Sequence, residues 1–315
     1  MDADADTGTG STAGDRPVAG MAWMLAGGVF ITIVAVLVKL LVDRLSVTQI
    51  ALVRSVFLVV AVLPFLARLG RPGLTVHRPV LMATRAVMLA YVTVAGFWTL
   101  SKLPIVYVTT ASFAKPLFVT LLAALLLGER VGWRRSLATA AGFLGVLVML
   151  MPGATGALPA VPALVAISVA VALAAGVIMV KHLVVGNDPS TIIFYCNLGV
   201  VAALIGPAAA DWTAPDPSEW LLLAALGVAS LASQNCFIRA YRAAEASLVA
   251  PFEYVRILFS ATAGFLVFAE VPQPWTGIGA VVIVAATLYL ARREAALRRQ
   301  ARLARRADCR DGDPY

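Results

Sequence analysis

One stretch of sequence decides how this chain folds: IVYVTTASFAKPLFVTLLAALLL, which covers Ile105–Leu127. It is apolar and long enough to cross a bilayer, because a helix needs about 20 residues to span the hydrocarbon core. Lys115 nevertheless stands at its centre, where a cation costs about 2.5–3.5 kcal/mol on insertion scales. Pro116 follows at once and lacks the N–H group that the carbonyl of Ser112 would receive in a continuous helix. A charge beside an interrupted helix predicts a polar place inside a membrane protein.

The composition indicates a polytopic membrane protein. Of the 315 residues, 61% are hydrophobic and only 13% are charged, about half the charged fraction of a soluble domain. The net charge is +8, but most arginines lie in short loops and the C-terminal tail, so we expect no nucleic-acid partner. The three cysteines lack the spacing of a disulfide framework or a metal site. We therefore expect neither a metal nor another cofactor.

Ten candidate spanning helices follow one another along the chain, and the sequence predicts an all-α fold. Their ranges are about 19–42, 47–67, 79–100, 105–127, 134–151, 160–181, 190–209, 219–238, 248–269 and 275–291. Each is near the length that a bilayer core of about 30 Å requires. Because the connections are short, consecutive helices should pack as antiparallel neighbours.

Basic residues in the loops predict the orientation. With the N-terminus in the cytoplasm, the cytoplasmic loops and the C-terminal tail carry seventeen Lys and Arg residues, whereas the opposite loops hold only Arg44 and Lys102. An excess of positive charge in short loops marks the cytoplasmic side. The sequence therefore predicts a multi-pass protein of the plasma (inner) membrane with its N-terminus and its C-terminus both in the cytoplasm.

The two ends of the chain differ from its apolar middle. Residues 1–18 are mostly acidic, Gly and Thr residues, and we expect a disordered cytoplasmic tail there. Residues 292–315 form a basic tail. We expect its first part to lie on anionic lipid headgroups, at roughly 1 kcal/mol per basic side chain. The alternative is a solvated cytoplasmic tail.

The two halves of the chain resemble each other weakly, at an offset of 141 to 143 residues. At this offset Lys115 matches Arg256, another cation within an apolar run. We therefore predict two five-helix repeats, at residues 19–153 and 154–291. An odd number of helices in each repeat requires the repeats to be inverted across the membrane, and inverted repeats place a shared site near the midplane. The alternative is chance similarity between apolar segments.

Two stretches carry a resemblance to a known family. They are LSKLPIVYVTTASFAKPLFVTLLAALLLGERVGWRRSLATAAGFLGVLVMLMPG (100–153) and AYRAAEASLVAPFEYVRILFSATAGFLVFAEVPQPWTGIGAVVIV (240–284). The proline of the fourth helix, the LGER sequence at its end, the glycine-containing fifth helix, and the PFEY and AE-P sequences match the family pattern. Lys39 and Arg54 match its first two helices. On these residues the sequence resembles the drug/metabolite transporter superfamily, EamA type.

This resemblance implies ten helices in two inverted five-helix repeats, and transport of small metabolites by alternating access. It does not fix the substrate, which varies widely within the family. The chain departs from the family at Lys115, because members commonly carry a small or apolar residue before the proline of the fourth helix. We therefore expect Lys115 to influence substrate selectivity rather than the shared transport mechanism.

The charges within the predicted spans are the candidate substrate-binding residues. Lys115 either lines a cavity and meets an anionic or zwitterionic substrate, or pairs with a neighbouring helix and only holds the packing. Ser112, one helical turn earlier, lies on the same face. Pro116 is the expected site of a helix kink.

The ninth predicted helix, at residues 248–269, carries a second candidate group. Glu253 and Arg256 are three residues apart and share one helix face. They either bind substrate or form a self-neutralising pair that makes a polar helix easier to bury. Tyr254, between them, either donates a hydrogen bond to substrate or simply packs.

Other polar residues of the spans have weaker indications. Lys39 and Arg85 lie near helix ends, and we expect both to extend their side chains to the membrane interface. Arg54 lies deeper. Asn197 is its counterpart in the second repeat and can form a hydrogen bond between helices. We count Lys39, Arg54 and Asn197 among the candidate translocation residues.

Two glutamates end matching helices, Glu129 and Glu270. A carboxylate at a helix C-terminus opposes the helix dipole. Glu129 has arginines nearby in sequence, whereas nothing in the sequence explains Glu270.

The leading hypothesis is a secondary transporter for a small polar organic metabolite, and the implied partner is that small molecule. The alternatives are an integral-membrane enzyme and a non-transporting membrane scaffold. An enzyme needs a concentrated acid–base, nucleophile or metal constellation, and the sequence carries none. We expect no P-loop-driven transport either. Whether two copies form a homodimer is left open.

Overall fold

The computed structural model of this protein describes residues 17–70, 75–127, 133–149, 159–243, 252–271, 273–286, 288–289, 292 and 296. Within these residues every regular element is a helix and no strand occurs. The N-terminal tail, Glu129 and nearly all of the basic C-terminal tail lie outside them. The predictions about these segments therefore stay predictions.

The helices begin and end close to the predicted ranges. They are α1 (Pro17–Leu41), α2 (Val47–Leu69), α4 (Pro79–Lys102), α5 (Ile105–Ser112), α6 (Lys115–Leu127), α7 (Trp133–Met149), α8 (Ala160–Leu183), α9 (Pro189–Ala210), α10 (Pro217–Ala243) and α12 (Arg256–Phe268). A further apolar helix covers Pro274–Ala286. Each of the ten predicted ranges thus contains helical residues. Among the described helices, six are long and apolar enough to cross a membrane.

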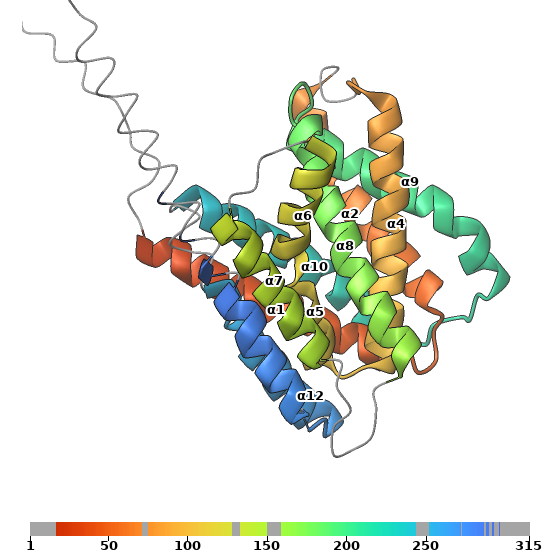
Figure 1. Ribbon diagram of the computed structural model, residues 1–315. Helices are drawn as coiled ribbons and strands as arrows, with labels where there is room; N and C mark the ends of the chain where they lie inside the picture. Colours follow the sequence, from red (N-terminus) through yellow and green to blue (C-terminus); the bar gives the residue numbers. More distant parts are fainter. Residues whose placement is uncertain are drawn as a thin grey trace, which may run out of the picture.

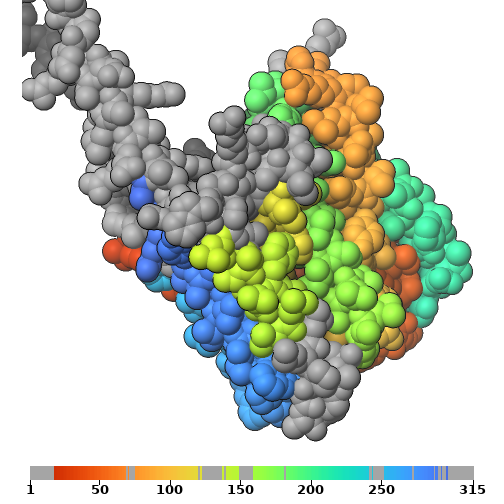
Figure 2. Space-filling view, viewed as in Figure 1, coloured from red at the N-terminus to blue at the C-terminus, as the bar shows by residue number. Residues whose placement is uncertain are grey.

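The helices pack along one another as a bundle (Figure 1). α1 lies along α10, α2 lies along α9, and α4 packs against both α8 and α9. The space-filling view shows α4, in orange, beside α8, in green (Figure 2). α6 packs against α7 and α8, and α12 packs against α1 and α5. α5, α6 and α12 therefore all belong to the bundle.

Two apolar clusters form most of the core. One joins buried side chains of α1, α2, α4, α9 and α10. The other surrounds the turn between α5 and α6 and includes side chains of α7, α8 and the helix Pro274–Ala286. Small residues allow close helix approaches: a Cβ atom added at Gly199 of α9 would lie 2.5 Å from the Cβ of Ala86 of α4.

Amide side chains hold loops at both ends of the bundle. At one end the Gln49 amide donates to the carbonyl of Thr213 at 2.8 Å and accepts the N–H of Thr213 at 3.2 Å. At the other, Asn187 accepts the N–H of His77 at 2.8 Å and donates to the carbonyl of His77 at 3.1 Å. These paired bonds satisfy loop backbone groups that have no partner within a helix.

Candidate functional site

The stretch 105–127 forms two helices rather than one. α5 ends at Ser112, the next two residues form a turn, and α6 begins at Lys115. Pro116 is the second residue of α6. Proline is tolerated there, because the N–H groups of a first helical turn have no partner within the helix. The interruption therefore lies just before the proline, near the middle of the stretch.

A second helix is interrupted in the same way, 141 residues later in sequence. The chain is helical at residues 252–253, turns at Tyr254 and Val255, and enters α12 at Arg256. At each break, the last residue of the turn accepts N–H groups from the third and fourth residues after it. The distances are 3.0 and 3.2 Å at Ala114, and 2.9 and 3.2 Å at Val255. The two breaks are thus equivalent in position and in hydrogen bonding.

The two breaks contact each other. The Arg256 guanidinium donates through Nη2 to the Ser112 hydroxyl at 2.6 Å, and its central carbon lies 4.7 Å from the centroid of the Phe113 ring. The Phe113 and Tyr254 rings are 4.9 Å apart between centroids and tilted by 45°. Phe113 and Tyr254 are equivalent at the offset of 141, so two matching residues of the breaks meet. The structure brings together Ser112, Tyr254 and Arg256 of the predicted site.

Lys115 and Glu253 lie beside this contact, and both are half-buried. Among the residues that the structure describes, neither side chain forms a hydrogen bond or an ion pair. The pairing of Glu253 with Arg256, which the sequence left open, is not formed within 4.0 Å, although the two charges still attract each other over a longer distance. Lys115 equally has no carboxylate of the described residues holding it in place.

The structure explains the position of Glu270. Its carboxylate forms an ion pair with Lys39, at the end of α1. The same carboxylate accepts the N–H of Ile105, the first residue of α5, at 2.9 Å. Lys39 also donates to the carbonyl of Leu103 at 3.2 Å and lies 5.2 Å from the centroid of the Phe268 ring. A carboxylate at a helix N-terminus is favoured by the helix dipole, so Glu270 stabilises α5 rather than its own helix.

The expectation that Lys39 and Arg85 extend to the membrane interface is wrong for Lys39. Its side chain is only 18% exposed and is engaged by Glu270, which is 13% exposed. Arg85 does not reach out freely either: its Nε is buried and lacks a hydrogen-bond partner in the described structure. A Cβ atom added at Gly176 of α8 would lie 3.3 Å from the Arg85 guanidinium carbon. Arg85 therefore packs between helices.

α5 and α12 run in opposite directions where they touch. The start of α5, Ile105, meets Glu270 just beyond the end of α12. The end of α5, Ser112, meets Arg256 at the start of α12. Two contacts at opposite ends of the pair require an antiparallel arrangement. The carboxylate and the guanidinium thus join the same two helices at both ends.

Arg54 and Asn197 lie away from these contacts. The Arg54 Nε donates to the Ser230 hydroxyl of α10 at 3.0 Å, and its guanidinium carbon is 5.7 Å from the centroid of the Phe97 ring. Asn197 is buried and donates to the carbonyl of Ile193, within its own helix, at 2.8 Å. Within the described part of the chain Asn197 shows no bond to another helix, contrary to the expectation, whereas Arg54 links α2 to α10.

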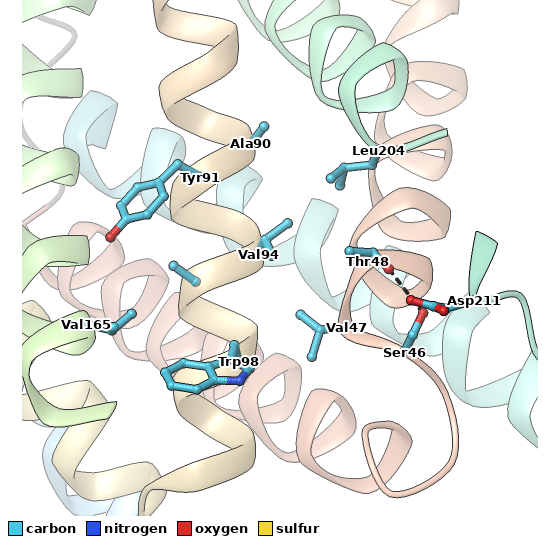
Figure 3. A pocket seen from close by; sticks show the side chains of 11 residues that line it. Ser46, Val47, Thr48, Ala90, Tyr91, Val94, Trp98, Val165, Leu204 and Asp211 are labelled. Atoms are coloured by element: carbon cyan, nitrogen blue, oxygen red, sulfur yellow. Dashed lines mark hydrogen bonds between the residues drawn. The ribbon is translucent and has the colours of Figure 1, made fainter. Parts of the chain in front are cut away.

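A pocket of about 610 Å³ opens elsewhere, between α2, α4, α8 and α9 (Figure 3). Its lining residues are Ser46, Val47, Thr48, Ala90, Tyr91, Val94, Ala95, Trp98, Val165, Leu204 and Asp211. Apolar side chains form most of its wall, and the Tyr91 hydroxyl shares a hydrogen bond of 2.6 Å with the Ser168 hydroxyl. The lining includes none of the predicted site residues. The charges at the helix breaks, rather than this apolar pocket, mark the candidate site.

Sequence reasoning missed Phe113, Ser230 and Glu270 as members of polar or ring contacts. It also missed the second break, because the predicted helix 248–269 has no proline directly after Arg256. The offset of 141 was the signal that could have placed this break. No group of three or more His, Cys, Asp or Glu residues able to hold a metal occurs in the described part of the chain.

Known proteins are similar to this chain in sequence and in fold. The EamA-like transporter family matches residues 18–151 and again residues 161–292. The S-adenosylmethionine uptake transporter of Rickettsia prowazekii (strain Madrid E) is 31% identical over 271 residues, covering 86% of this chain and 92% of its own. The riboflavin transporter of Vibrio cholerae is 31% identical over 280 residues, covering 87% and 93%. The pseudopaline exporter of Pseudomonas aeruginosa is 31% identical over 213 residues, covering 67% and 75%.

A crystal structure of another protein, 21% identical, covers 88% of this chain and 98% of its own with a TM-score of 0.59. At that identity the likeness concerns the fold alone. The family match covers most of the chain, and the relatives are transporters rather than enzymes. The protein therefore belongs to the EamA-like transporter family, and is a multi-pass membrane transporter within the drug/metabolite transporter superfamily.

Proposed function

We propose that this protein is a secondary transporter that moves a small polar organic metabolite across the plasma membrane by alternating access. The observation that carries the proposal is the contact between two equivalent helix breaks, in which Arg256 donates to Ser112 at 2.6 Å. Broken helices near the membrane midplane are how transporters with inverted repeats build their substrate sites. The names of the relatives support small metabolites as cargo.

The proposed topology has ten spans in two inverted five-helix repeats, with both termini in the cytoplasm. The antiparallel contact of α5 with α12 supports the inversion, because α5 begins the fourth predicted span and α12 ends the ninth, its counterpart in the second repeat. The excess of basic residues in one set of loops supports the orientation. In this orientation Lys39, Ile105 and Glu270 lie at the outer end of the bundle.

We assign the outer closure of the transport path to the Lys39–Glu270 ion pair. This pair ties the end of α1 to the chain after α12, and Glu270 also holds the first N–H group of α5. Outward opening would separate these helix ends and expose both charges to water. Once the helix ends separate, water can solvate both charges and offset part of the free energy lost with the ion pair.

The substrate site proper lies one helix length further in, at the two breaks. Arg256 and Ser112 join the halves, Tyr254 packs on Phe113, and Lys115 and Glu253 present charges that form no ion pair in the described chain. Arg54, joined to α10 through Ser230, is a further buried cation of the transport path. We leave Asn197 out of the binding site, since its amide is engaged within α9.

Flux into proteoliposomes tests the proposed function. Purified protein is reconstituted, and uptake of S-adenosylmethionine, riboflavin and a panel of amino acids and organic acids is measured down their own gradients. We expect saturable uptake of at least one compound, and exchange of that compound when it is preloaded. A scaffold predicts uptake no faster than in empty vesicles for every compound, and that outcome would refute the proposal.

A further inference from the structure

We propose that the cargo is a zwitterion, a metabolite that carries one carboxylate and one ammonium group, and that Lys115 and Glu253 bind these two charges. The inference rests on the proposed function, because it names the substrate class of the same site. It starts from two opposite charges that lie beside the contact of the breaks and form no hydrogen bond or ion pair with any residue that the structure describes.

Stability does not explain the lysine at position 115. An unpaired lysine within a span is unfavourable on insertion scales. Lys115 is also the first residue of α6, where the helix dipole disfavours a cation. Stability alone would favour an acidic or neutral residue at this position. Lys115 therefore lacks a partner among the residues that the structure describes, and a bound substrate can supply one.

The repeat places the two charges opposite each other. At the offset of 141, Ser112 corresponds to Glu253 and Arg256 corresponds to Lys115. In a two-fold arrangement, a contact between one pair of residues implies a matching contact between their equivalents. The observed bond from Arg256 to Ser112 thus corresponds to an approach of Lys115 to Glu253.

The contact of Phe113 with Tyr254 locates the axis of this relation. These residues are equivalent, and equivalent residues touch each other only at a two-fold axis. Their rings meet at 4.9 Å between centroids. Lys115 follows Phe113 by two residues and Glu253 precedes Tyr254 by one, so the two charges lie near the same ring contact.

Only one of the two equivalent contacts is made. Arg256 reaches Ser112, whereas Lys115 and Glu253 form no ion pair within 4.0 Å. A ligand that carries both charges satisfies both side chains at once. A simple anion leaves Glu253 without a contact partner, and a simple cation leaves Lys115 without one. A half-buried charge without a partner loses part of its hydration and gains nothing in return. The pair therefore selects a zwitterion.

Matched ligands test the substrate class on the purified full-length protein. L-phenylalanine is compared with phenethylamine and 3-phenylpropionate, and L-methionine with 3-(methylthio)propylamine and 4-(methylthio)butanoate. Each is used as a competitor of the flux found in proteoliposomes and as a ligand in thermal unfolding. We expect each zwitterion to compete at least about tenfold better than its two single-charge analogues, the ratio that corresponds to 1.4 kcal/mol.

Two single variants test which ligand charge each side chain binds. Lys115→Gln should lose the preference for the zwitterion over the amine, and Glu253→Gln should lose the preference over the carboxylate. The charge exchange K115E/E253K should restore a zwitterion preference that both single variants have lost. Lys102→Gln, an exposed lysine at the end of α4, is the matched control and should behave like the wild type. Retention of wild-type elution on gel filtration shows that the variants fold.

Two results would overturn the proposal. One is a wild-type protein that takes a single-charge or neutral compound, such as riboflavin, as well as any zwitterion. The other is an equal effect of K115Q and E253Q on all three members of a ligand set. In both cases measured flux still supports a transporter, whereas the absence of flux for every compound refutes the proposed function itself.

Discussion

Lys39 and Glu270, 231 residues apart in sequence, form an ion pair that joins the end of α1 to the chain just beyond α12. The second carboxylate oxygen of Glu270 accepts the first N–H group of α5 at 2.9 Å. One side chain thus neutralises a lysine and caps a helix from a distant part of the chain. The contact joins the ends of three helices.

Removing this contact should destabilise the protein. We expect Glu270→Gln and Lys39→Met each to lower the free energy of unfolding by about 2 kcal/mol, less than the 3–5 kcal/mol of a fully buried pair. The exchange K39E/E270K should recover only part of this loss, because a lysine side chain at position 270 cannot accept the N–H of Ile105. Thermal unfolding in detergent ranks the stabilities of the wild type, the two single variants and the exchange variant. Full recovery by the exchange would show that the helix cap contributes nothing.

Gly264 tests the same contact from the backbone side. A Cβ atom at this position would lie 2.6 Å from Oε2 of Glu270, so Gly264→Ala should displace the carboxylate and lower both stability and transport. Gly277→Ala is the matched control, since nothing lies within 4 Å of its added Cβ atom. In the control, alanine should stabilise the helix by about 0.5–1 kcal/mol. Equal melting temperatures for the two variants would contradict the assigned geometry.

A pair of glycines on α9 tests the packing against α4. A Cβ atom at Gly199 would lie 2.5 Å from the Cβ of Ala86, whereas nothing lies within 4 Å of one at Gly206. We expect Gly199→Ala to cost about 1–3 kcal/mol through overpacking, and Gly206→Ala to be neutral or slightly stabilising. Unfolding of both variants in the same detergent provides the comparison. A neutral Gly199→Ala would mean that the helices lie further apart.

The exposed contact of Arg44 with Asp216 should add no pH dependence near neutrality. The hydrogen bond to Asp216 raises the pKa of the Arg44 guanidinium, although burial acts in the opposite direction. A raised folded-state pKa stabilises the fold below the unfolded-state pKa, and this contribution disappears only as the pH rises above it. Between about pH 6 and 9 the arginine stays charged. Arg44→Ala should therefore shift the melting temperature equally throughout this range, and by less in high salt.

Much of the fold could be predicted from hydrophobicity alone. The ends of α2, α4, α8 and α9 lie within about three residues of the predicted ones, because apolar runs of bilayer length between polar loops leave little choice. The break after Ser112 was indicated by Pro116. The equivalent break before Arg256 has no such local signal. The offset of 141 could have indicated its position, and the hydrogen bonds at the matching residues show it.

The sequence could not predict which charged side chains contact which residues. Lys39 looked like a lysine near a helix end, and Glu270 opposed the dipole of its own helix. Their pairing depends on the packing of α12 against α1 and α5, which places residues from opposite ends of the chain together. The charges of Lys115 and Arg256 were evident in the sequence, whereas the bond to Ser112 needed the three-dimensional fold.

The most direct test of the central claim is substrate exchange by Arg256→Gln. This variant removes the guanidinium that joins the two breaks, whereas the control Arg239→Gln removes one that lies exposed, 5.0 Å from the centroid of the Trp23 ring. Initial exchange rates in proteoliposomes are compared at equal reconstituted protein. We predict that R256Q loses at least about tenfold in kcat/KM, as expected from a lost charged contact of about 1.4 kcal/mol or more, while R239Q retains the wild-type rate. Wild-type exchange by R256Q would show that the substrate does not pass through the paired breaks.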